Sequence, residues 1–316
     1  MIQVRPASDG DRKEILARME EVSGTAKRQR IERRWDWQWQ QDPRLEVPGY
    51  QGVVVEWRDS IIGSLSCVPA GLHIAGAPVA ASWIVDIFVH TGLTRQALRD
   101  VKRGGGGLGP ELAKGVAAAM LDHPAAGSIQ LGKHIADRMM AVGLTIGFVQ
   151  SASTLNYTRR VSVVRPLQKS LGKGLGLLLG SAADLAVSRF RRPPLELEPF
   201  QGDFDARFDR LWARARDQYP AITLRDAQTL NWRYRRHPDT TYEVLILRRD
   251  GEIRGYAVFM LYERRGRSLA RIVDLLTDKD DREAADALVA GVLERARSEK
   301  AERLDWFACA WTARPR

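Results

Sequence analysis

Apolar residues gather into two stretches whose pattern predicts β-hairpins. Residues 50–68 contain two apolar strands joined by a turn around Asp59, and residues 242–260 contain two more, joined by a turn around Asp250. Aspartate favours such turns because its short side chain tolerates the backbone angles that a tight reversal requires. The chain therefore contains two predicted hairpins of the same layout.

Each hairpin is flanked by the same features in the same order. A helix with one apolar face precedes it, the motif W-x-[WY]-x-x-x-P follows that helix, and an apolar strand with an Ile-Val-Asp or similar sequence comes last. The helices are predicted at 9–22 and 203–218, the motifs at Trp37-Trp39-Pro43 and Trp232-Tyr234-Pro238, and the strands at 83–90 and 271–278, with Asp86 and Asp274. These features predict an internal duplication: two α/β units of related fold.

The length of 316 residues and the hydrophobic content of 44% also favour two domains. We expect an N-terminal domain at 1–164, a linker helix region at 165–195 and a C-terminal domain at 196–316. The uncharged run 174–183 within the linker is too short to span a bilayer. The linker is interpreted as an inter-domain helix packed on protein, with peripheral contact at a membrane surface, through its basic flanks, as the alternative.

The formal net charge of +10 predicts a surface that attracts anions such as nucleic acid, acidic lipid or a phosphorylated cofactor. Arginine clusters occur at 28–34 and 189–193, where solvated helix faces or linkers are the alternative explanation. Cys67 and Cys309 lie in apolar, strand-like runs, which favours buried thiols and a reducing, cytoplasmic setting. The N-terminus carries charge from Arg5 onward and does not resemble a signal peptide. The five histidines lack ligand spacing, so no structural metal is expected.

A glycine-rich stretch is the main chemical signal. Residues 103–109, with the sequence RGGGGLG, follow the strand at 83–90 and precede a predicted helix with Pro110 in its first turn. Glycines before a helix let backbone N–H groups approach an anion closely, and the helix dipole favours negative charge there. The stretch therefore predicts a diphosphate-binding loop, with a merely flexible loop as the alternative.

This order of strand, glycine loop and helix resembles the acyl-CoA-binding motif of the GNAT (GCN5-related N-acetyltransferase) superfamily. The residues that match the motif are Val89 at the end of the strand, Gly107 and Gly109 in the loop, and Leu112 in the helix. The resemblance covers about residues 1–150. The tryptophan motif extends it to 200–316 and to a bacterial subgroup with tandem GNAT-like units.

The resemblance implies two units, each with a mixed, mostly antiparallel sheet flanked by helices. It implies transfer of an acyl group, acetyl in the first instance, from acyl-CoA to an amine of a small-molecule or glycan-precursor acceptor. Loop N–H groups would hold the pyrophosphate, and the pantetheine arm would lie between two splayed strands. The implied acyl-CoA-binding residues are Phe88, Val89, Arg103, Gly104, Gly105, Gly106, Gly107, Leu108 and Gly109. In the second unit the corresponding stretch, 279–296, is acidic, so we expect a degenerate unit that helps to form the acceptor cleft.

The resemblance also implies a base that takes a proton from the attacking amine. Asp86 is the expected base, and a structural, hydrogen-bonded aspartate is the alternative, which the paired Asp274 supports. The tyrosine that protonates the departing thiolate in many relatives would align with Met139. Either Tyr157, the nearest tyrosine in sequence, is the acid, or the thiolate leaves without one.

Two other classes of function stay open. Arg30, Arg33 and Arg34 beside Trp35, Trp37 and Trp39 form a basic and aromatic stretch that could stack nucleic-acid bases. The favoured interpretation of the tryptophans is that they are packing groups that brace the hairpin. A tRNA-dependent aminoacyl transferase is the remaining alternative, because tandem GNAT-like proteins also support that chemistry.

Overall fold

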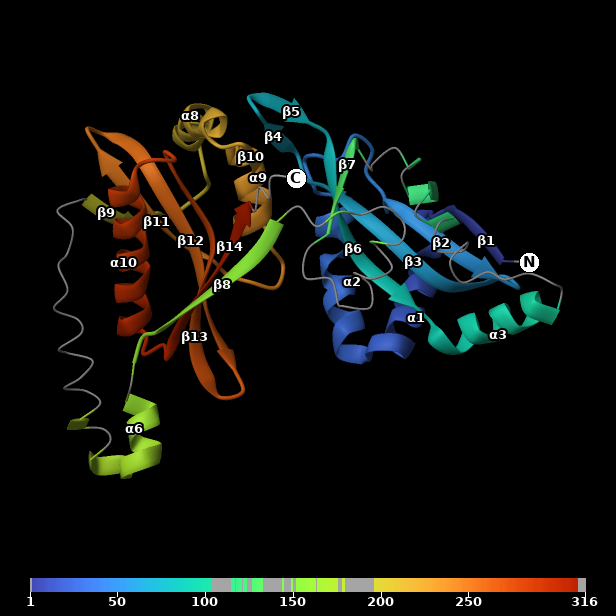
Figure 1. Ribbon diagram of the computed structural model, residues 1–316, viewed down its shortest axis with the longest axis horizontal. Helices are drawn as coiled ribbons and strands as arrows, with labels where there is room; N and C mark the ends of the chain where they lie inside the picture. The colour runs from blue at the N-terminus through green and yellow to red at the C-terminus, as the bar shows by residue number, and fades with distance from the viewer. Residues whose placement is uncertain are drawn as a thin grey trace. The chain divides into compact units, whose positions relative to one another are not determined.

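The computed structural model describes most of the chain. The described residues are 2–103, 115–116, 118–120, 122–123, 127–132, 144, 149, 152–162, 164–175, 178–179 and 196–311. In this part of the chain no helix is long and apolar enough to cross a membrane. The chain forms two compact units, and each unit is discontinuous in sequence (Figure 1).

The contents of the two units differ from the domain boundaries expected from the sequence. Unit 1 contains Met1–Val149 and a later segment, Pro220–Asp239, whereas unit 2 contains Gln150–Tyr219 and Thr240–Arg316. The sequence alone places 150–164 with the first domain and 220–239 with the second. Unit 1 thus contains a segment from the second half of the chain, 220–239, and unit 2 contains a segment from the first domain expected from the sequence, 150–164.

Unit 1 is built on a five-stranded sheet in the order β1-β2-β3-β6-β7. Its strands are β1 (Ile2–Pro6), β2 (Gly52–Trp57), β3 (Ser60–Pro69), β6 (Ala81–Val89) and β7 (Ile129–Leu131). Its helices are η1 (Asp9–Asp11), α1 (Arg12–Ser23), α2 (Thr25–Trp39), α3 (Thr91–Arg103), α9 (Ala227–Leu230) and η4 (Asn231–Arg235). A small second sheet has the order β10-β4-β5, with β10 (Ala221–Thr223), β4 (Leu72–Ile74) and β5 (Ala77–Val79).

Helices cover both faces of the unit 1 sheet. Val54 of β2 packs in a cluster with Ile15 of α1 and Trp35 of α2, whereas Val55 packs with Ala97 of α3. Successive residues of a strand point to opposite faces, so α1 and α2 lie on one face and α3 on the other. Burial on both faces explains why β2 is apolar almost throughout rather than alternating.

Unit 2 contains a six-stranded sheet in the order β8-β14-β13-β12-β11-β9. Its strands are β8 (Ala152–Arg160), β9 (Glu196–Pro199), β11 (Glu243–Arg249), β12 (Glu252–Arg264), β13 (Arg267–Thr277) and β14 (Arg303–Trp311). Its helices are α6 (Val164–Leu171), α8 (Ala206–Ala215), η3 (Arg216–Gln218) and α10 (Arg282–Ser298). The helix α10 lies along one face of this sheet (Figure 1), where its alanines and Leu288 join the main core cluster of the unit.

The two sheets share one strand order, as the predicted duplication requires. The strands β1, β2, β3, β6 and β7 correspond to β9, β11, β12, β13 and β14. Along these five strands of each sheet the first three pairings are antiparallel and the fourth is parallel. The unit 2 sheet has a further strand, β8, which pairs with β14 antiparallel. Both predicted hairpins are confirmed, and Asp59 and Asp250 in their turns have positive φ angles of 58° and 55°.

The two tryptophan motifs pack against each other within unit 1. The rings of Trp37 and Trp232 are stacked, with centroids 4.4 Å apart and an interplanar angle of 5°. Each indole N–H donates a hydrogen bond to the other residue's backbone carbonyl, at 2.9 Å in both directions. Arg33 and Arg34 add ion pairs to Asp239 at 2.8 and 2.7 Å. The repeated motif therefore serves to pair α2 with the segment 220–239.

The predicted linker region is described in part. The helix α6 begins it, and Leu171, Leu175, Leu178 and Leu179 are exposed. The arginine cluster at 189–193 and the rest of 180–195 lie outside the described residues.

Candidate functional site

Asp86 lies at a β-bulge in the middle of β6. In the ladder between β3 and β6, Ser66 pairs with Val85 and Ser64 pairs with Phe88, so Asp86 and Ile87 together face a single residue of β3. Asp86 has a φ angle of +49°, in the left-handed region where aspartate and asparagine are better tolerated than other residues with a side chain. The bulge changes the direction of the strand and places the carboxyl group at the irregular point of the sheet.

The carboxyl group of Asp86 faces the helix α2. The amide of Gln38 donates a hydrogen bond to Asp86 Oδ2 at 3.0 Å, and this is the one hydrogen bond of that carboxylate to a described residue. Burial raises the pKa of Asp86 because it penalises the charged form. The Gln38 hydrogen bond opposes this shift, as do the charges of three basic residues on α2, which are Lys27, Arg34 and Arg30. A partly buried carboxylate of raised pKa is suited to accept a proton.

The corresponding residue of unit 2, Asp274, has a different environment. It is 6% exposed, accepts a hydrogen bond from the Tyr256 hydroxyl at 3.2 Å, and accepts another from the backbone N–H of Leu275 at 3.0 Å. Tyr256 on β12 occupies the place that Ser64 has on β3. Asp274 therefore fits the interpretation of a structural, hydrogen-bonded aspartate. Because Asp86 has a different environment, the role of Asp274 does not indicate the role of Asp86.

Tyr50 links the helix α2 to the strand β3 near Asp86. Its ring stacks on Trp35 at 5.0 Å and meets Trp39 edge-on at 4.8 Å, and its hydroxyl shares a hydrogen bond with Ser64 at 2.8 Å. Burial raises the pKa of Tyr50 to about 12, with the nearby charge of Asp86 as a further contribution. Tyr50 thus keeps its proton at neutral pH. Sequence analysis missed this residue because its role depends on contacts with α2 and β3.

The edge of β6 next to Asp86 is open in the described part of the sheet. The parallel pairing of β6 with β7 covers Ala81 to Trp83, and β6 continues for a further six residues to Val89. Backbone N–H and C=O groups on an unpaired strand edge can bind an extended ligand that carries amides. Of the implied acyl-CoA-binding residues on this strand, Phe88 is buried in the core and Val89 is 45% exposed.

The glycine loop is separated from β6 by a helix. The stretch between them, which the sequence shows only as polar, forms α3, and Arg103 is its last residue. The implied loop residues Gly104, Gly105, Gly106, Gly107, Leu108 and Gly109 lie outside the described residues, as does the side chain of Arg103. Residues 115–116 and 118–120 are helical, as the sequence predicts.

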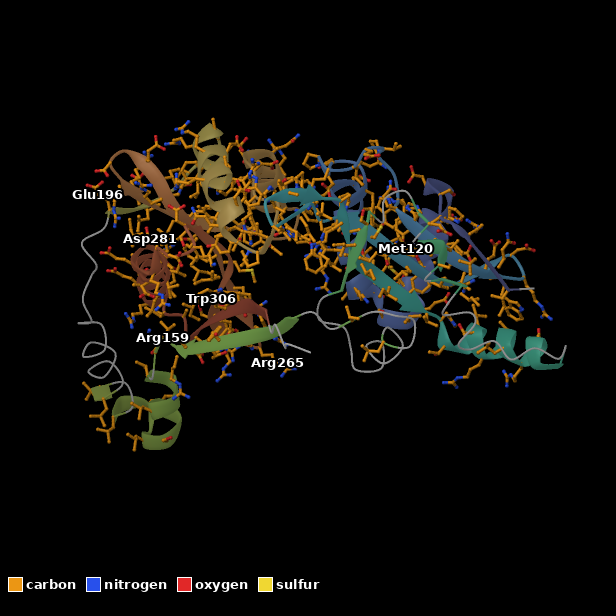
Figure 2. The ribbon with its side chains drawn as sticks, turned by 45° about the horizontal axis from the view of Figure 1, so that its top comes forward. Met120, Arg159, Glu196, Arg265, Asp281 and Trp306 are labelled. Carbon is orange, nitrogen blue, oxygen red and sulfur yellow. The ribbon has the colours of Figure 1, made fainter. Side chains whose placement is uncertain are left out.

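Tyr157, the candidate acid, belongs to unit 2. It lies on β8 opposite Trp306 of β14, which Figure 2 labels, and its side chain is 52% exposed. Asp86 belongs to unit 1, so the two sequence-predicted catalytic residues are in different compact units. The described site in unit 1 consists of Asp86, Gln38, Tyr50 and Ser64.

Other chemical groups of the described residues do not form a second catalytic centre. Burial raises the pKa of Cys67 to about 11, so this thiol is a poor nucleophile at neutral pH. No cluster of three or more His, Cys, Asp or Glu residues in the described ranges could hold a metal ion. Trp35 and Trp39 are buried and Trp37 is stacked on Trp232, so the rings proposed to stack bases are occupied by packing.

Comparison with known proteins relates this fold to acyltransferases. No protein-family model and no curated protein sequence matches the chain. A probable N-acyltransferase from Enterococcus faecalis aligns over 98% of this chain and 66% of its own, with a TM-score of 0.61 and 12% identity. A GCN5-related N-acetyltransferase from Anabaena variabilis aligns over 99% and 67%, with a TM-score of 0.59 and 14% identity.

Saccharomyces cerevisiae N-myristoyltransferase with bound myristoyl-CoA aligns over 96% of this chain and 76% of its own, with a TM-score of 0.52 and 12% identity. The chain spans about two thirds of the length of the two bacterial proteins. At these identities the comparisons establish architecture. The fold of this chain is the one shared by GCN5-related N-acetyltransferases and N-myristoyltransferases.

Proposed function

We propose that this protein is an acyl-CoA-dependent N-acyltransferase that uses the unit 1 site. The observation that carries the proposal is that Asp86, a partly buried carboxylate of raised pKa, lies at a bulge of β6 where no described strand pairs with the other edge. The fold supports it, because one protein of the same fold binds myristoyl-CoA. The tandem organisation and the use of acetyl-CoA in particular are part of the same proposal.

The described residues fit an acyl-CoA donor at the open edge of β6. The register with β3 directs the backbone groups of Val89, unlike those of Phe88, to the other edge of β6, where they would bind an amide of the pantetheine arm. The glycines among 104–109 would contact the pyrophosphate through their N–H groups. The donor supplies an activated thioester carbon. The protein's own groups orient it and remove water, since Tyr50 and the tryptophans around it form an apolar wall.

Asp86 would act on the acceptor. An amine must lose a proton as it attacks the thioester carbon, and the Asp86 oxygen that accepts no hydrogen bond from a described residue can take that proton directly or through one water. The C–S bond of the thioester then breaks, and coenzyme A leaves as a thiolate that takes a proton from solvent. Gln38 holds the other oxygen and so fixes the orientation of the carboxyl group. The raised pKa of Asp86 brings its proton affinity closer to neutral pH, where a general base is most effective.

Calorimetric titration of acetyl-CoA, myristoyl-CoA and free CoA tests the donor. We expect binding to the intact protein and its loss in a Gly107→Val/Gly109→Val variant that circular dichroism shows to be folded. A matched Gly174→Val variant, altered at an exposed glycine of unit 2 where an added side chain meets no neighbour among the described residues, should bind normally if it also folds. Absence of binding by all three ligands to the intact protein would contradict the proposal.

A further inference from the structure

The helix α2 presents a basic stripe next to Asp86. Lys27, Arg30, Arg34 and Gln38 follow one another at spacings of three and four residues, so they lie along one side of the helix. Gln38, at the end of the stripe, bonds to Asp86. The remaining members of the stripe therefore extend away from the candidate base along the same helix side.

Two of these cations lack a charged partner among the described residues. Arg34 is paired with Asp239. Lys27 has a long contact of 3.4 Å to the hydroxyl of Ser23, and no ion pair or hydrogen bond to a described residue involves the Arg30 side chain. The stripe thus ends in two positive charges that the described part of the protein does not neutralise.

The carboxylates around the stripe have other partners. Glu20 pairs with Arg28 and with the Thr25 hydroxyl, Glu21 with Arg18 and His90, and Glu32 with Arg28. Asp86 itself is bonded to an uncharged amide. Lys27 and Arg30 lie on the same side of α2 as Gln38, which bonds to Asp86, and their charges favour the ionised form of that carboxyl. Positive charge is therefore in excess around the candidate base.

We propose that the acceptor amine carries an anionic group, a carboxylate or a phosphate, which Lys27 and Arg30 bind while the amine lies at Asp86. This inference rests on the proposed transferase function and names its substrate class. A carboxylate or phosphate accepts charge-assisted hydrogen bonds from ammonium and guanidinium groups, and these are stronger than bonds between neutral groups. Holding the anion on α2 would orient the nucleophilic nitrogen toward the bulge of β6.

Matched pairs of amines test the inference. The pairs are phenylalanine with phenylalaninamide, and glucosamine 6-phosphate with glucosamine, so each pair differs by the anionic group. Binding is measured by saturation-transfer NMR without donor, and acyl transfer is measured with acetyl-CoA and myristoyl-CoA. The variants are Lys27→Gln/Arg30→Gln and a control, Lys13→Gln/Lys279→Gln, which removes the same charge from two exposed lysines elsewhere.

We expect at least one anionic compound to bind about tenfold or more tightly than its neutral counterpart. The selectivity should disappear in Lys27→Gln/Arg30→Gln and persist in the control. The anion whose pair, phenylalanine with phenylalaninamide or glucosamine 6-phosphate with glucosamine, shows the larger selectivity is the preferred one. Equal binding within both pairs, or selectivity that survives in Lys27→Gln/Arg30→Gln, would overturn the inference.

The design separates this inference from the transferase proposal. Loss of acyl-CoA binding in Lys27→Gln/Arg30→Gln would assign the two cations to the donor and would overturn the inference while leaving the transferase standing. Anion-selective binding without any acyl-CoA binding would support the anion site and count against the transferase.

Discussion

At the scale of single residues, the two copies of the fold treat the same aspartate differently. Tyr256 and a backbone N–H satisfy Asp274, whereas Asp86 has one amide donor and a second oxygen that accepts no hydrogen bond from a described residue. The smaller Ser64 stands where unit 2 has Tyr256, and its hydroxyl bonds to Tyr50 at 2.8 Å, whereas the hydroxyl of Tyr256 bonds to Asp274. The difference between serine and tyrosine at one position thus separates a structural carboxylate from a candidate base.

The variant Asp86→Asn should lose activity and gain stability. Asparagine also tolerates the left-handed backbone at this position, so the bulge should persist. A folded-state pKa above the unfolded value means that ionisation at neutral pH opposes folding, and the neutral amide removes that penalty. We expect acyl transfer to fall about 10²–10⁴-fold, while the melting temperature rises at pH 7.5 and shows no rise at pH 3.

Both the acyl-transfer activity and the melting temperature are needed to interpret Asp86→Asn. Activity assays at saturating donor and thermal melts at the two pH values supply them. A variant that melts lower at pH 7.5 would indicate that Asp86 is a structural carboxylate like Asp274.

The lowered pKa of His237 predicts that the protein loses stability in mild acid. Burial and the charge of Arg34 lower its pKa to about 4, with Asp239 opposing the shift. Because the unfolded state binds a proton near pH 6.5 and the folded state does so near pH 4, stability should fall as the pH drops through that interval. Urea denaturation at pH 7.5, 6, 5 and 4 should show a smaller decrease for His237→Gln than for the unaltered protein. Equal decreases would show that other groups cause the acid sensitivity.

At the scale of elements, α2 connects the core, the candidate base and the later segment of unit 1. Trp35 and Trp39 enter the core, Gln38 bonds to Asp86, and Trp37 pairs with Trp232. Residues four apart lie on one side of a helix, whereas neighbours in sequence point in different directions. One helix therefore couples the packing of the tryptophan motif to the orientation of the site.

The stacked tryptophans should be energetically coupled. Trp37→Phe and Trp232→Phe each remove an indole N–H and leave a backbone carbonyl without its donor, so each should cost about 1–2 kcal/mol of unfolding free energy. Because the contact is reciprocal, the double variant should cost less than the sum, with a coupling of roughly 1 kcal/mol. Urea denaturation of all four proteins measures this cycle. Additive losses would mean that the rings stabilise the fold independently.

The elements that local sequence determines were predictable, and the contacts between distant elements were not. The hairpins, the helices at 9–22 and 203–218 and the repeat follow from turn residues and periodicity within short stretches. The Trp37–Trp232 pair joins residues 195 positions apart, and the Asp86 bulge depends on the register between β3 and β6. The two-residue spacing of the tryptophans also gave no indication of α2. Tyr50 and Gln38 could not be found without those tertiary contacts.

At the scale of the whole molecule, sequence order and structural order differ. The chain passes from unit 1 to unit 2, back to unit 1 for residues 220–239, and again to unit 2. The strand β8 forms the edge of the unit 2 sheet although it precedes the linker region. Neither half of the sequence therefore contains all parts of one compact unit.

Residues 1–149 alone should not form a stable unit. They lack Trp232, the ion pairs to Asp239, and β10, which pairs with β4. We expect thermal unfolding of 1–149 to be broad and non-cooperative, and the addition of 220–239 through a flexible glycine-serine linker to restore a sharp transition. A sharp transition for 1–149 alone, at the same temperature as the linked chain, would contradict this expectation.

The exchange of segments also sets the order of events during synthesis. A ribosome adds about 5–20 residues per second and releases the N-terminal half first. Trp37 and the edge of β4 therefore lack their partners, Trp232 and β10, until residue 239 has left the exit tunnel. An unpaired strand edge and an exposed aromatic ring are each a site for aggregation and for chaperone binding. The nascent chain is thus most vulnerable in the interval between completion of β7 and emergence of the second tryptophan motif.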